Sequence, residues 1–397
     1  MKVVYSNHTF PDAWPHAIFL AGPTPRDPET PSWRPEALKE LEALGYGGVV
    51  FIPEEDTGDW KGAYTDQVEW EKAGLGFADK IVFWVPRNLR TMPALTTNIE
   101  FGQYVDSGKA VLGFPEGTPK MRYLEWLAAD VPPDVPVLST LKETLEAAIE
   151  GWDKGNESTD HDRMQGERYV PKDIWDTPMF QSWYHNLKSV DNRLDEAKVL
   201  WAFRMPRLRS VFSYVLWVKV WIEAEERFKE NEWVFARTDI GATVLYRNPH
   251  PDEFDVLDTE IVLVKEFRSP GRTPDGFIHE LPGGSCEGND DSARVSAARE
   301  VYEETGIAIP DDRFRYIGSR QPLGILSTHK AHCFAVELTE DEMVNAKKLA
   351  DSNTTFGEEQ DSELTYVEVV SVKDLFQRED SDWTTLGIVM RAITQTY

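Results

Sequence analysis

Cysteine is scarce in this chain of 397 residues, which holds only Cys286 and Cys333. Two cysteines cannot build the framework of a disulfide-stapled domain, and nothing in their positions marks a metal-binding pair. Long apolar runs are missing too. The most apolar stretch, residues 211–224, is short and interrupted by Lys219, so it is not a membrane span. The first residues lack the basic-then-apolar pattern of a signal peptide. We therefore expect a cytoplasmic protein without a membrane partner.

Basic residues are also fewer than acidic residues. The chain has 42 Lys and Arg against 69 Asp and Glu, a formal net charge of -27. Such a charge repels phosphate backbones and anionic lipids, so nucleic acid is not an expected partner. Anionic small molecules remain possible substrates, because a divalent cation held by carboxylates reverses the local sign. The hydrophobic content of 41% is that of a globular protein, and the length predicts two to three domains.

The first 150 residues alternate between short apolar runs and helix-like segments such as 34–44 and 120–129. Apolar strands separated by helices predict a parallel sheet that is covered on both faces. We therefore predict an α/β domain over residues 1–152, a five-stranded doubly wound parallel sheet of the flavodoxin type. Its ligands are expected at the carboxyl ends of the strands. The five expected strands are 17–21, 48–52, 80–85, 110–114 and 135–138.

The character of the chain changes after this domain. Residues 151–168 are polar, charged and punctuated by glycine, which is typical of a linker. Residues from about 173 to 229 are rich in Trp and Phe, and their apolar faces favour a helical connector that packs the domains or a partner subunit. We therefore assign residues 153–230 to a linker and helical connector. Strand patterns resume at 232–246 and 260–267, within a last domain over residues 231–397.

The strongest motif of the last domain spans residues 281–307. A glycine-rich turn leads into a helix that we expect to begin near Ser292 and to end at Gly306. Glu300, Glu303 and Glu304 stand at i, i+3 and i+4, so their carboxylates project from one face. Hard divalent cations take oxygen ligands and would relieve the repulsion among them. An acidic, solvated helix is the alternative.

This segment resembles the Nudix box, the signature of the Nudix hydrolases. The matching residues are Arg299, Glu300, Val301, Glu303, Glu304, Gly306 and Ile307. The front half departs from the signature, since Asp291 stands in the place of its first glutamate and Gly284 lies one residue too far away. The resemblance implies an α/β/α sandwich with a mixed sheet. It also implies Mg²⁺, or Mn²⁺ in its place, on Glu300, Glu303 and Glu304, and hydrolysis of a nucleoside diphosphate linked to another group.

The flanks of the motif look like the ADP-ribose pyrophosphatase branch of this family, on residues 264–270, 279–284 and Pro322. That likeness implies that Arg268 reaches a phosphate and that Glu280 supports substrate or metal. It also implies the carbonyl oxygen of Gly283 as a further metal ligand. An ordinary strand edge is the alternative. Nudix enzymes of this branch are commonly dimers, which suggests a homodimer through the connector or the Nudix domain.

A general base is needed to take the proton of the attacking water. Residues 357–363 form an acidic loop before the strand expected at 364–370, where the same branch carries a mobile acidic loop. Glu359 is the first candidate, with Glu358 and Glu363 close behind. Acidic loop tips are often only solvated, so a loop without a catalytic role is the alternative.

Three clusters in the first domain are expected at the carboxyl ends of predicted strands. A strand runs into the turn of Gly22 and Pro23, Asp79 precedes another strand, and residues 96–102 open a helix. Thr97 or Asn98 would cap that helix. Glu100 would then lie in its first turn, where the helix dipole keeps a carboxylate ionised and available as a nucleophile.

The arrangement resembles the nucleoside 2-deoxyribosyltransferase superfamily over about residues 16–150. In that family a glutamate in a Thr-Asn-x-Glu-x-Gly context attacks the anomeric carbon and displaces the base, which implies this role for Glu100, with Asn98 at the substrate. Asp79 matches an aspartate that helps bind or protonate the base, and Gly22 and Pro23 match a loop facing sugar or phosphate. A plain flavodoxin-like domain, with Glu100 as a helix-capping acid, is the alternative.

Together these motifs predict a bifunctional enzyme that acts on small-molecule nucleotides. One half would cleave a diphosphate such as ADP-ribose with Mg²⁺, and the other would cleave or exchange an N-glycosidic bond through Glu100. Removing the base from NAD would give an ADP-ribose-like product for the Nudix half. A nucleotide sensor or scaffold that binds without turnover is the competing hypothesis, although a pure binder has no need of Glu300, Glu303 and Glu304.

Overall fold

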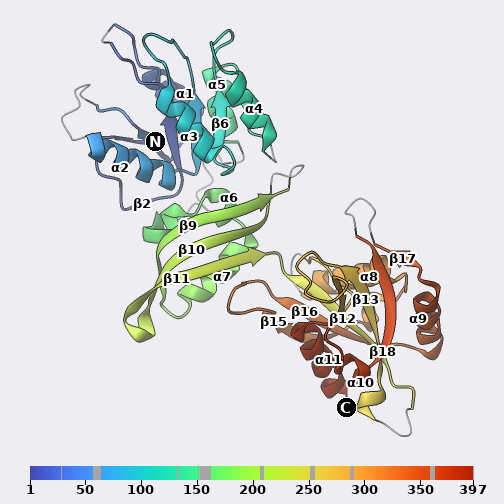
Figure 1. The fold of residues 1–397 in the computed structure, drawn as a ribbon. Coiled ribbons are helices and arrows are strands. Elements are labelled where there is room, and N and C mark those ends of the chain that lie inside the picture. The colour runs from blue at the N-terminus through green and yellow to red at the C-terminus, as the bar shows by residue number, and fades with distance from the viewer. Residues whose placement is uncertain are drawn as a thin grey trace. The chain divides into compact units, whose positions relative to one another are not determined.

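The chain divides into two units, Met1–Ala236 and Arg237–Tyr397 (Figure 1). No helix among the described residues combines the length and the apolar character that a bilayer crossing requires. The computed structural model describes residues 1–27, 29–56, 64–131, 134–150, 152, 162–205, 210–250, 255–286, 290–357 and 363–396, without the side chains of 290–292 and 396.

The first unit is built on a parallel sheet of six strands in the order β1-β4-β3-β5-β6-β7. The prediction of a doubly wound parallel sheet is confirmed, but the number of five strands is wrong. The extra strand is β1, which pairs with β4 at the edge and has only one buried residue among its four, so it lacks the continuous buried apolar run that marks the inner strands. The strands are β1 (Lys2–Tyr5), β3 (Ala17–Ala21), β4 (Val49–Ile52), β5 (Lys80–Trp84), β6 (Ala110–Gly113) and β7 (Val137–Leu138).

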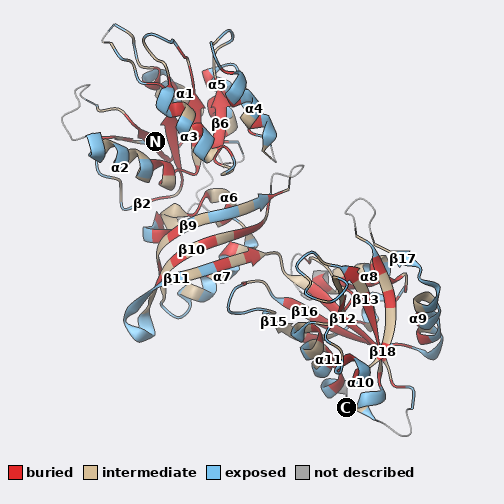
Figure 2. Cartoon of the chain, viewed as in Figure 1, coloured by how far each residue is buried: buried red, intermediate tan, exposed pale blue. Residues whose placement is uncertain are grey.

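Helices cover both faces of this sheet because its strands are apolar on both sides. Phe19, Phe51 and Phe83 belong to the core under α2, α3 and α4, whereas Ile18 and Val82 belong to the core under α1 and α5. The four inner strands β4, β3, β5 and β6 are coloured almost entirely as buried in Figure 2. The helices are α1 (Arg34–Ala43), α2 (Tyr64–Phe77), α3 (Leu95–Tyr104), α4 (Arg122–Asp130) and α5 (Leu141–Ala148).

The expected helical connector is mostly a sheet. Among the described residues of this segment, the α-helices are α6 (Lys172–Trp175) and α7 (Pro178–Lys188). Three long strands follow, β9 (Arg193–Arg204), β10 (Val211–Ile222) and β11 (Arg227–Arg237). In β10 the buried and partly exposed residues alternate between 215 and 220, which is the period of a half-buried strand. Val, Ile, Tyr and Trp fit such a pleated surface better than a helix. A short pair, β2 (Ala13–Trp14) and β8 (Arg163–Met164), completes the unit.

The second unit has a mixed sheet in the order β15-β16-β12-β13-β18-β17, with β14 paired to β13. Helices α8 and α9 pack on one face and α10 and α11 on the other, so the expected α/β/α sandwich is confirmed. Its strands are β12 (Ile240–Arg247), β13 (Glu260–Phe267), β14 (Phe277–Glu280), β15 (Arg315–Arg320), β16 (Ala331–Glu337), β17 (Thr355–Phe356) and β18 (Thr365–Ser371). Its helices are α8 (Asp290–Thr305), α9 (Glu340–Ser352), α10 (Val372–Leu375) and α11 (Trp383–Thr396).

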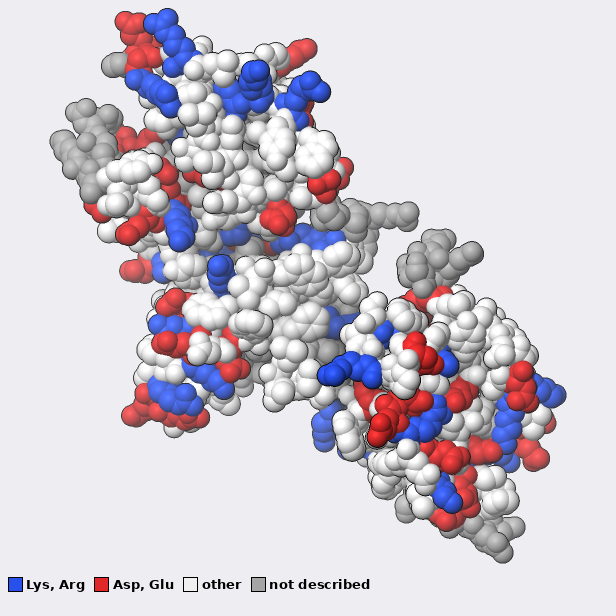
Figure 3. All heavy atoms as spheres, in the orientation of Figure 1, with Lys and Arg blue, Asp and Glu red and all other residues white. Residues whose placement is uncertain are grey.

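The net charge of -27 is spread over the surface. Acidic and basic side chains alternate over the visible face of each unit, without a continuous basic stripe (Figure 3). This face therefore offers no extended track for a phosphate backbone, and the sites are better sought at the edges of the two large sheets.

Candidate functional sites

The turn after β3 forms one side of the site in the first unit. Gly22 has a φ of 154°, and a Cβ there would lie 2.2 Å from the carbonyl oxygen of Trp84, so only glycine fits. Arg34 braces the turn: its Nη2 donates to the carbonyl oxygen of Gly22 at 2.9 Å, and its Nη1 donates to Oγ1 of Thr24 at 3.2 Å. Glu54 accepts from the same guanidinium, which compensates a buried charge.

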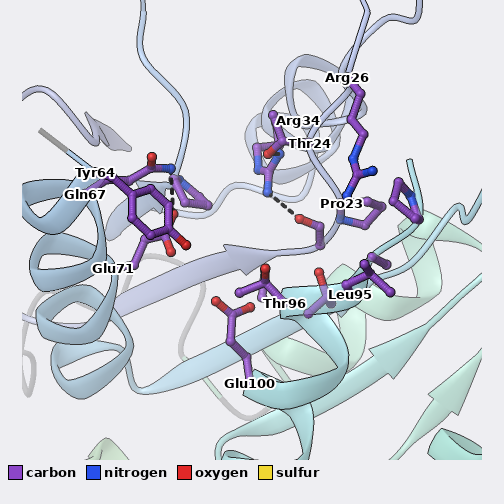
Figure 4. Close-up of a pocket in the computed structure, with 16 residues that line it drawn as sticks. Pro23, Thr24, Arg26, Arg34, Tyr64, Gln67, Glu71, Leu95, Thr96 and Glu100 are labelled. Atoms are coloured by element: carbon purple, nitrogen blue, oxygen red, sulfur yellow. Dashed lines mark hydrogen bonds between the residues drawn. The ribbon is translucent and has the colours of Figure 1, made fainter. Parts of the chain in front are cut away.

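A pocket of about 210 Å³ lies at the carboxyl ends of the strands, between this turn, α2 and the start of α3 (Figure 4). Open α/β sheets bind ligands at this edge. Three of the residues predicted for the site, Gly22, Pro23 and Glu100, line it together. The indole nitrogen of Trp33 donates to the carbonyl oxygen of Pro23 at 3.3 Å, so the turn is fixed from both sides.

Glu100 reaches the pocket from α3, but not in the predicted way. The helix begins directly after Ala94, which has a φ of 58°, and no side chain caps it. The predictions that Thr97 or Asn98 caps the helix and that Glu100 lies in its first turn are therefore wrong. In the second turn the helix dipole has little effect. Burial, together with the nearby charge of Glu71, raises the pKa of Glu100 to about 7, so the carboxylate is only partly ionised at neutral pH.

Glu71 is a second carboxylate of this pocket that the sequence analysis did not identify. It lies on α2, where Tyr64, Gln67 and Glu71 stand at i, i+3 and i+7 and line the pocket together. Burial raises the pKa of Glu71. The amide of Gln67 donates to Oε1 of Glu71 at 2.9 Å. The spacing of the three side chains along one helix face was the signal that could have revealed them.

Asp79 does not belong to this pocket. It precedes β5 at the amino-terminal edge of the sheet, and its Oδ2 accepts from the backbone nitrogen of Ala17 at 2.8 Å. The same oxygen accepts from Nη2 of Arg163 at 2.5 Å, and Oδ1 accepts from the backbone nitrogen of Lys172 at 2.8 Å. With 3% of its surface exposed, Asp79 is a structural anchor. The structure does not support the expected contact with the base.

Asn98 is also turned away from the pocket. Its Oδ1 accepts from Nη2 of Arg87, and Nη1 of the same arginine donates to the carbonyl oxygen of Lys120 at 2.9 Å. Arg87 is 7% exposed and therefore ties the start of α3 to the loop before α4. Asn98 was expected to bind substrate. In the structure it instead helps to hold the helix that carries Glu100.

The glutamates of the second unit lie on α8. Arg299 stands beside them, as expected from the sequence. Its Nη2 donates to Oε1 of Glu300 at 2.8 Å, and its Nη1 lies 3.4 Å from Oε2 of Glu303. Gly306 ends the helix with a φ of 69°, which confirms the left-handed position predicted for it.

Glu304 is the most deeply placed of these acids, with 5% of its surface exposed. One of its oxygens accepts from the backbone nitrogen of Gly283 at 2.8 Å. Burial and the charges of Glu300, Glu280 and Glu363 raise the pKa of Glu304 well above its usual range. Negative charge is thus concentrated around one buried carboxylate, which is the environment that a hard divalent cation compensates.

The paired glycines before α8 permit close packing. A Cβ on Gly283 would lie 2.0 Å from the carbonyl oxygen of Gly241, and one on Gly284 would lie 2.5 Å from the carboxyl carbon of Glu300. The backbone nitrogen of Gly241 donates to the carbonyl oxygen of Gly284 at 2.8 Å. The turn can therefore lie between β12 and α8. Residues 287–289 and the side chain of Asp291, where the motif departs from its signature, lie outside the described residues.

Arg268 and Glu280, both predicted at the substrate, are brought together. Nε and Nη2 of Arg268 donate to one oxygen of Glu280 at 2.9 and 2.8 Å. Nη2 also lies 2.9 Å from Oε2 of Glu266. Glu266 is 7% exposed, and burial raises its pKa. The sequence analysis missed this residue, although an acid inside an apolar strand was a visible signal.

Arg237 is a further basic residue close to Arg268. Its Nη2 donates to Oγ of Ser285 at 3.0 Å. Burial and the charge of Arg268 lower the pKa of Arg237. Two guanidinium groups that repel each other are stabilised when both bind an anionic ligand. Nothing in the sequence singled out Arg237, because its neighbour in space is remote along the chain.

Two of the three candidates for the general base, Glu358 and Glu359, lie outside the described residues. Glu363 is described, and its charge raises the pKa of both Glu304 and Glu266, so it lies near the α8 glutamates. Within the described part of the chain no three or more His, Cys, Asp or Glu side chains converge into a ready-made metal site.

Each unit is thus an α/β domain with a carboxylate-bearing helix at the edge of its sheet. Residues 15–118 match the family described as nucleoside 2-deoxyribosyltransferase like, and residues 249–389 match the NUDIX domain. The chain therefore carries a nucleoside 2-deoxyribosyltransferase-like domain and a NUDIX domain. NUDIX hydrolases generally need a divalent metal, usually Mg²⁺. No curated protein matches the chain.

Proposed function

We propose that the chain is a bifunctional enzyme of nucleotide metabolism. The first unit cleaves or exchanges the N-glycosidic bond of a nucleoside or nucleotide, and the second hydrolyses a nucleoside diphosphate of the ADP-ribose kind. The observation that carries the first half is the presence of Glu71 and Glu100 in one pocket. Displacement at an anomeric carbon uses two carboxyl groups, one ionised as the nucleophile and one protonated as the acid.

In this mechanism the ionised Glu100 attacks the anomeric carbon, and the bond between that carbon and the base nitrogen breaks. The electron pair of the bond passes to the base, which takes a proton from the carboxyl group of Glu71. A water molecule, or a second base, then attacks the same carbon and gives its proton to Glu71. Glu100 leaves as a carboxylate. The sum is a nucleoside and water in, and a free sugar and a base out.

The first half is tested by incubating the full chain with a panel of nucleosides, nucleotides and NAD and following the released bases by chromatography. A 2-deoxy-2-fluoro nucleoside slows the second step, so it should leave a sugar attached to Glu100 that mass spectrometry detects. Release of a base by the wild type and by the Glu100→Gln variant at equal rates would contradict the assignment.

In the second unit, Arg268 and Arg237 would hold the diphosphate, and Glu280 would fix the orientation of Arg268. Glu300, Glu303, Glu304 and the carbonyl oxygen of Gly283 would hold Mg²⁺ or Mn²⁺, as the concentration of buried negative charge around Glu304 favours. When bound, the metal neutralises the diphosphate and acidifies an attacking water. Glu363 would take the proton of that water, or one of Glu358 and Glu359.

The two activities would act in sequence on a dinucleotide such as NAD. Loss of the base gives a product with an intact diphosphate, which the second unit would split into AMP and a sugar phosphate. Incubation with ADP-ribose and Mg²⁺ tests the substrate directly. If no AMP forms, the ADP-ribose assignment fails.

A nucleotide sensor is the second candidate, because either domain can bind a nucleotide without turning it over. The Glu304→Gln variant separates the two candidates. An enzyme loses hydrolysis with this substitution, whereas a sensor has no hydrolysis to lose and keeps its affinity.

A further inference from the structure

Helix α2 presents a stripe of three side chains to the pocket of the first unit. Tyr64, Gln67 and Glu71 stand on its inner face, opposite Leu95 and Glu100 on α3 (Figure 4). Tyr64 is 75% exposed and Leu95 is 63% exposed, although both line the pocket. An aromatic and an aliphatic side chain on facing walls can hold a flat heterocycle between them.

Gln67 is held in place by its neighbour on the next turn. Its Nε2 donates one hydrogen to Oε1 of Glu71 at 2.9 Å. An amide has a second N–H hydrogen and a carbonyl oxygen, and no described residue forms a hydrogen bond with either of them. The amide therefore presents a donor and an acceptor side by side at the wall of the pocket, in an orientation fixed by Glu71.

The functional groups of Gln67 and Glu71 lie side by side, with Nε2 and Oε1 2.9 Å apart. A heterocycle that brings a ring nitrogen to the carboxyl group of Glu71 therefore has the adjacent edge within reach of Gln67. Glutamine pairs with such an edge through two hydrogen bonds when the edge carries a donor next to an acceptor.

We propose that Gln67 is the residue that selects the leaving base, by a two-point hydrogen bond to a base edge that carries a donor beside an acceptor. This inference rests on the glycosidic activity proposed for the same pocket. It assigns the substrate class as nucleosides whose base carries an N–H group next to an acceptor, and the exocyclic amino or amide group of adenine, cytosine and nicotinamide is the N–H group tested below. Removal of the exocyclic amino group should cost at least tenfold in kcat/KM, because one partner of the pair is then left without a hydrogen bond.

The test compares each substrate with an analogue that lacks only this group, using the full chain. The pairs are adenosine and purine riboside, cytidine and zebularine, and NAD and its 3-acetylpyridine analogue. We expect the wild type to prefer the first member of its best pair at least tenfold. The Gln67→Leu variant should bring that ratio close to one. Because the variant also releases Glu71, its kcat should fall for both members, but only a loss of recognition changes their ratio.

The matched control is Gln103→Leu, the same substitution on an exposed position of α3, which should keep the wild-type ratio. A wild-type ratio near one, or an unchanged ratio in Gln67→Leu, overturns the inference while the glycosidic activity stands.

If the wild type releases no base, the proposed function fails, and binding of the free bases tests Gln67 on its own. Adenine against purine, and nicotinamide against 3-acetylpyridine, can be titrated calorimetrically into the wild type and Gln67→Leu. A preference for the amino-bearing base that disappears in the variant supports the inference. Equal binding of the two bases by the wild type overturns it.

Discussion

Nη2 of Arg163 donates to Oδ2 of Asp79 at 2.5 Å, across 84 residues of the chain. Both side chains are 1% exposed. The guanidinium also donates to the carbonyl oxygens of Pro15 and Val170, so one buried ion pair joins the amino-terminal edge of the parallel sheet to the segment that follows it. An aspartate that resembles a catalytic residue in the sequence thus holds two parts of the first unit together.

The Asp79→Asn variant should be destabilised by about 3–5 kcal/mol, because it leaves Arg163 buried without a counter-charge. Urea unfolding followed by tryptophan fluorescence measures this loss. The control is Asp176→Asn, which breaks an exposed pair with Lys172 and should cost at most about 1 kcal/mol. The kcat of folded Asp79→Asn should match the wild type. A large loss of kcat at unchanged stability would show that Asp79 takes part in catalysis.

The pH profile of base release should rise near pH 7. Glu100 must be ionised to attack, and its pKa is raised to about 7, so the rate increases as the pH rises through this value. Glu71 must carry a proton to assist the leaving base, so deprotonation of Glu71, whose pKa burial also raises, opposes this gain. The two apparent values belong to the interacting pair. An ascending limb near pH 4.5 would show that Glu100 has the pKa of an exposed carboxyl group.

Glu71→Gln should distinguish substrates by their leaving groups. Release of adenine needs a proton donor, so kcat should fall by roughly 10²–10⁴. Nicotinamide leaves NAD as a neutral molecule without taking up a proton, so its release in the first turnover, before water attacks, should change much less than the first-turnover release of adenine. Glu69→Gln, on an exposed position of the same helix, serves as control. An equal loss for both substrates would mean that Glu71 shapes the pocket and does not donate a proton.

The two activities should be separable by single substitutions. Glu304→Gln, or removal of metal with EDTA, should abolish the release of AMP from ADP-ribose, because the buried charge that favours a cation is lost. Base release by the first unit should persist under both treatments. Glu100→Gln should give the opposite pattern. Both rates can be followed in one reaction by chromatography, and loss of both in either variant would contradict two independent sites.

Gly306→Ala should destabilise the second unit by about 1–2 kcal/mol, because a left-handed backbone conformation costs a residue with a side chain this much free energy. Its Cβ would also lie 2.4 Å from the ring of Phe356, which adds to the loss. Gly387→Ala is the matched control, because Gly387 lies inside α11 with no atom within 4 Å of a Cβ. It should be neutral or stabilising. Thermal unfolding of the two variants gives the comparison.

Local patterns in the sequence were enough for both large domains. Apolar runs of four or five residues separated by helices predicted the parallel sheet, and Glu300, Glu303, Glu304 and Gly306 marked α8 and its end. The prediction of helix failed between 193 and 229, where long aromatic and β-branched stretches form strands. Short windows of such residues do not separate a helix from a half-buried strand, and the partners that decide between them are remote in sequence.

The local motifs of this chain determined its two α/β domains and the helix that carries Glu100. Only the tertiary structure decided which carboxylates meet. Asp79 and Glu71 lie eight residues apart, yet the strand and the helix place them at opposite edges of one sheet. The end of α2 lies between them, and a helix advances about 1.5 Å per residue, so it carries the chain from the pocket back to the other edge of the sheet. The packing of helices and strands therefore decides which catalytic residues meet, and the spacing of residues along the sequence does not reveal it.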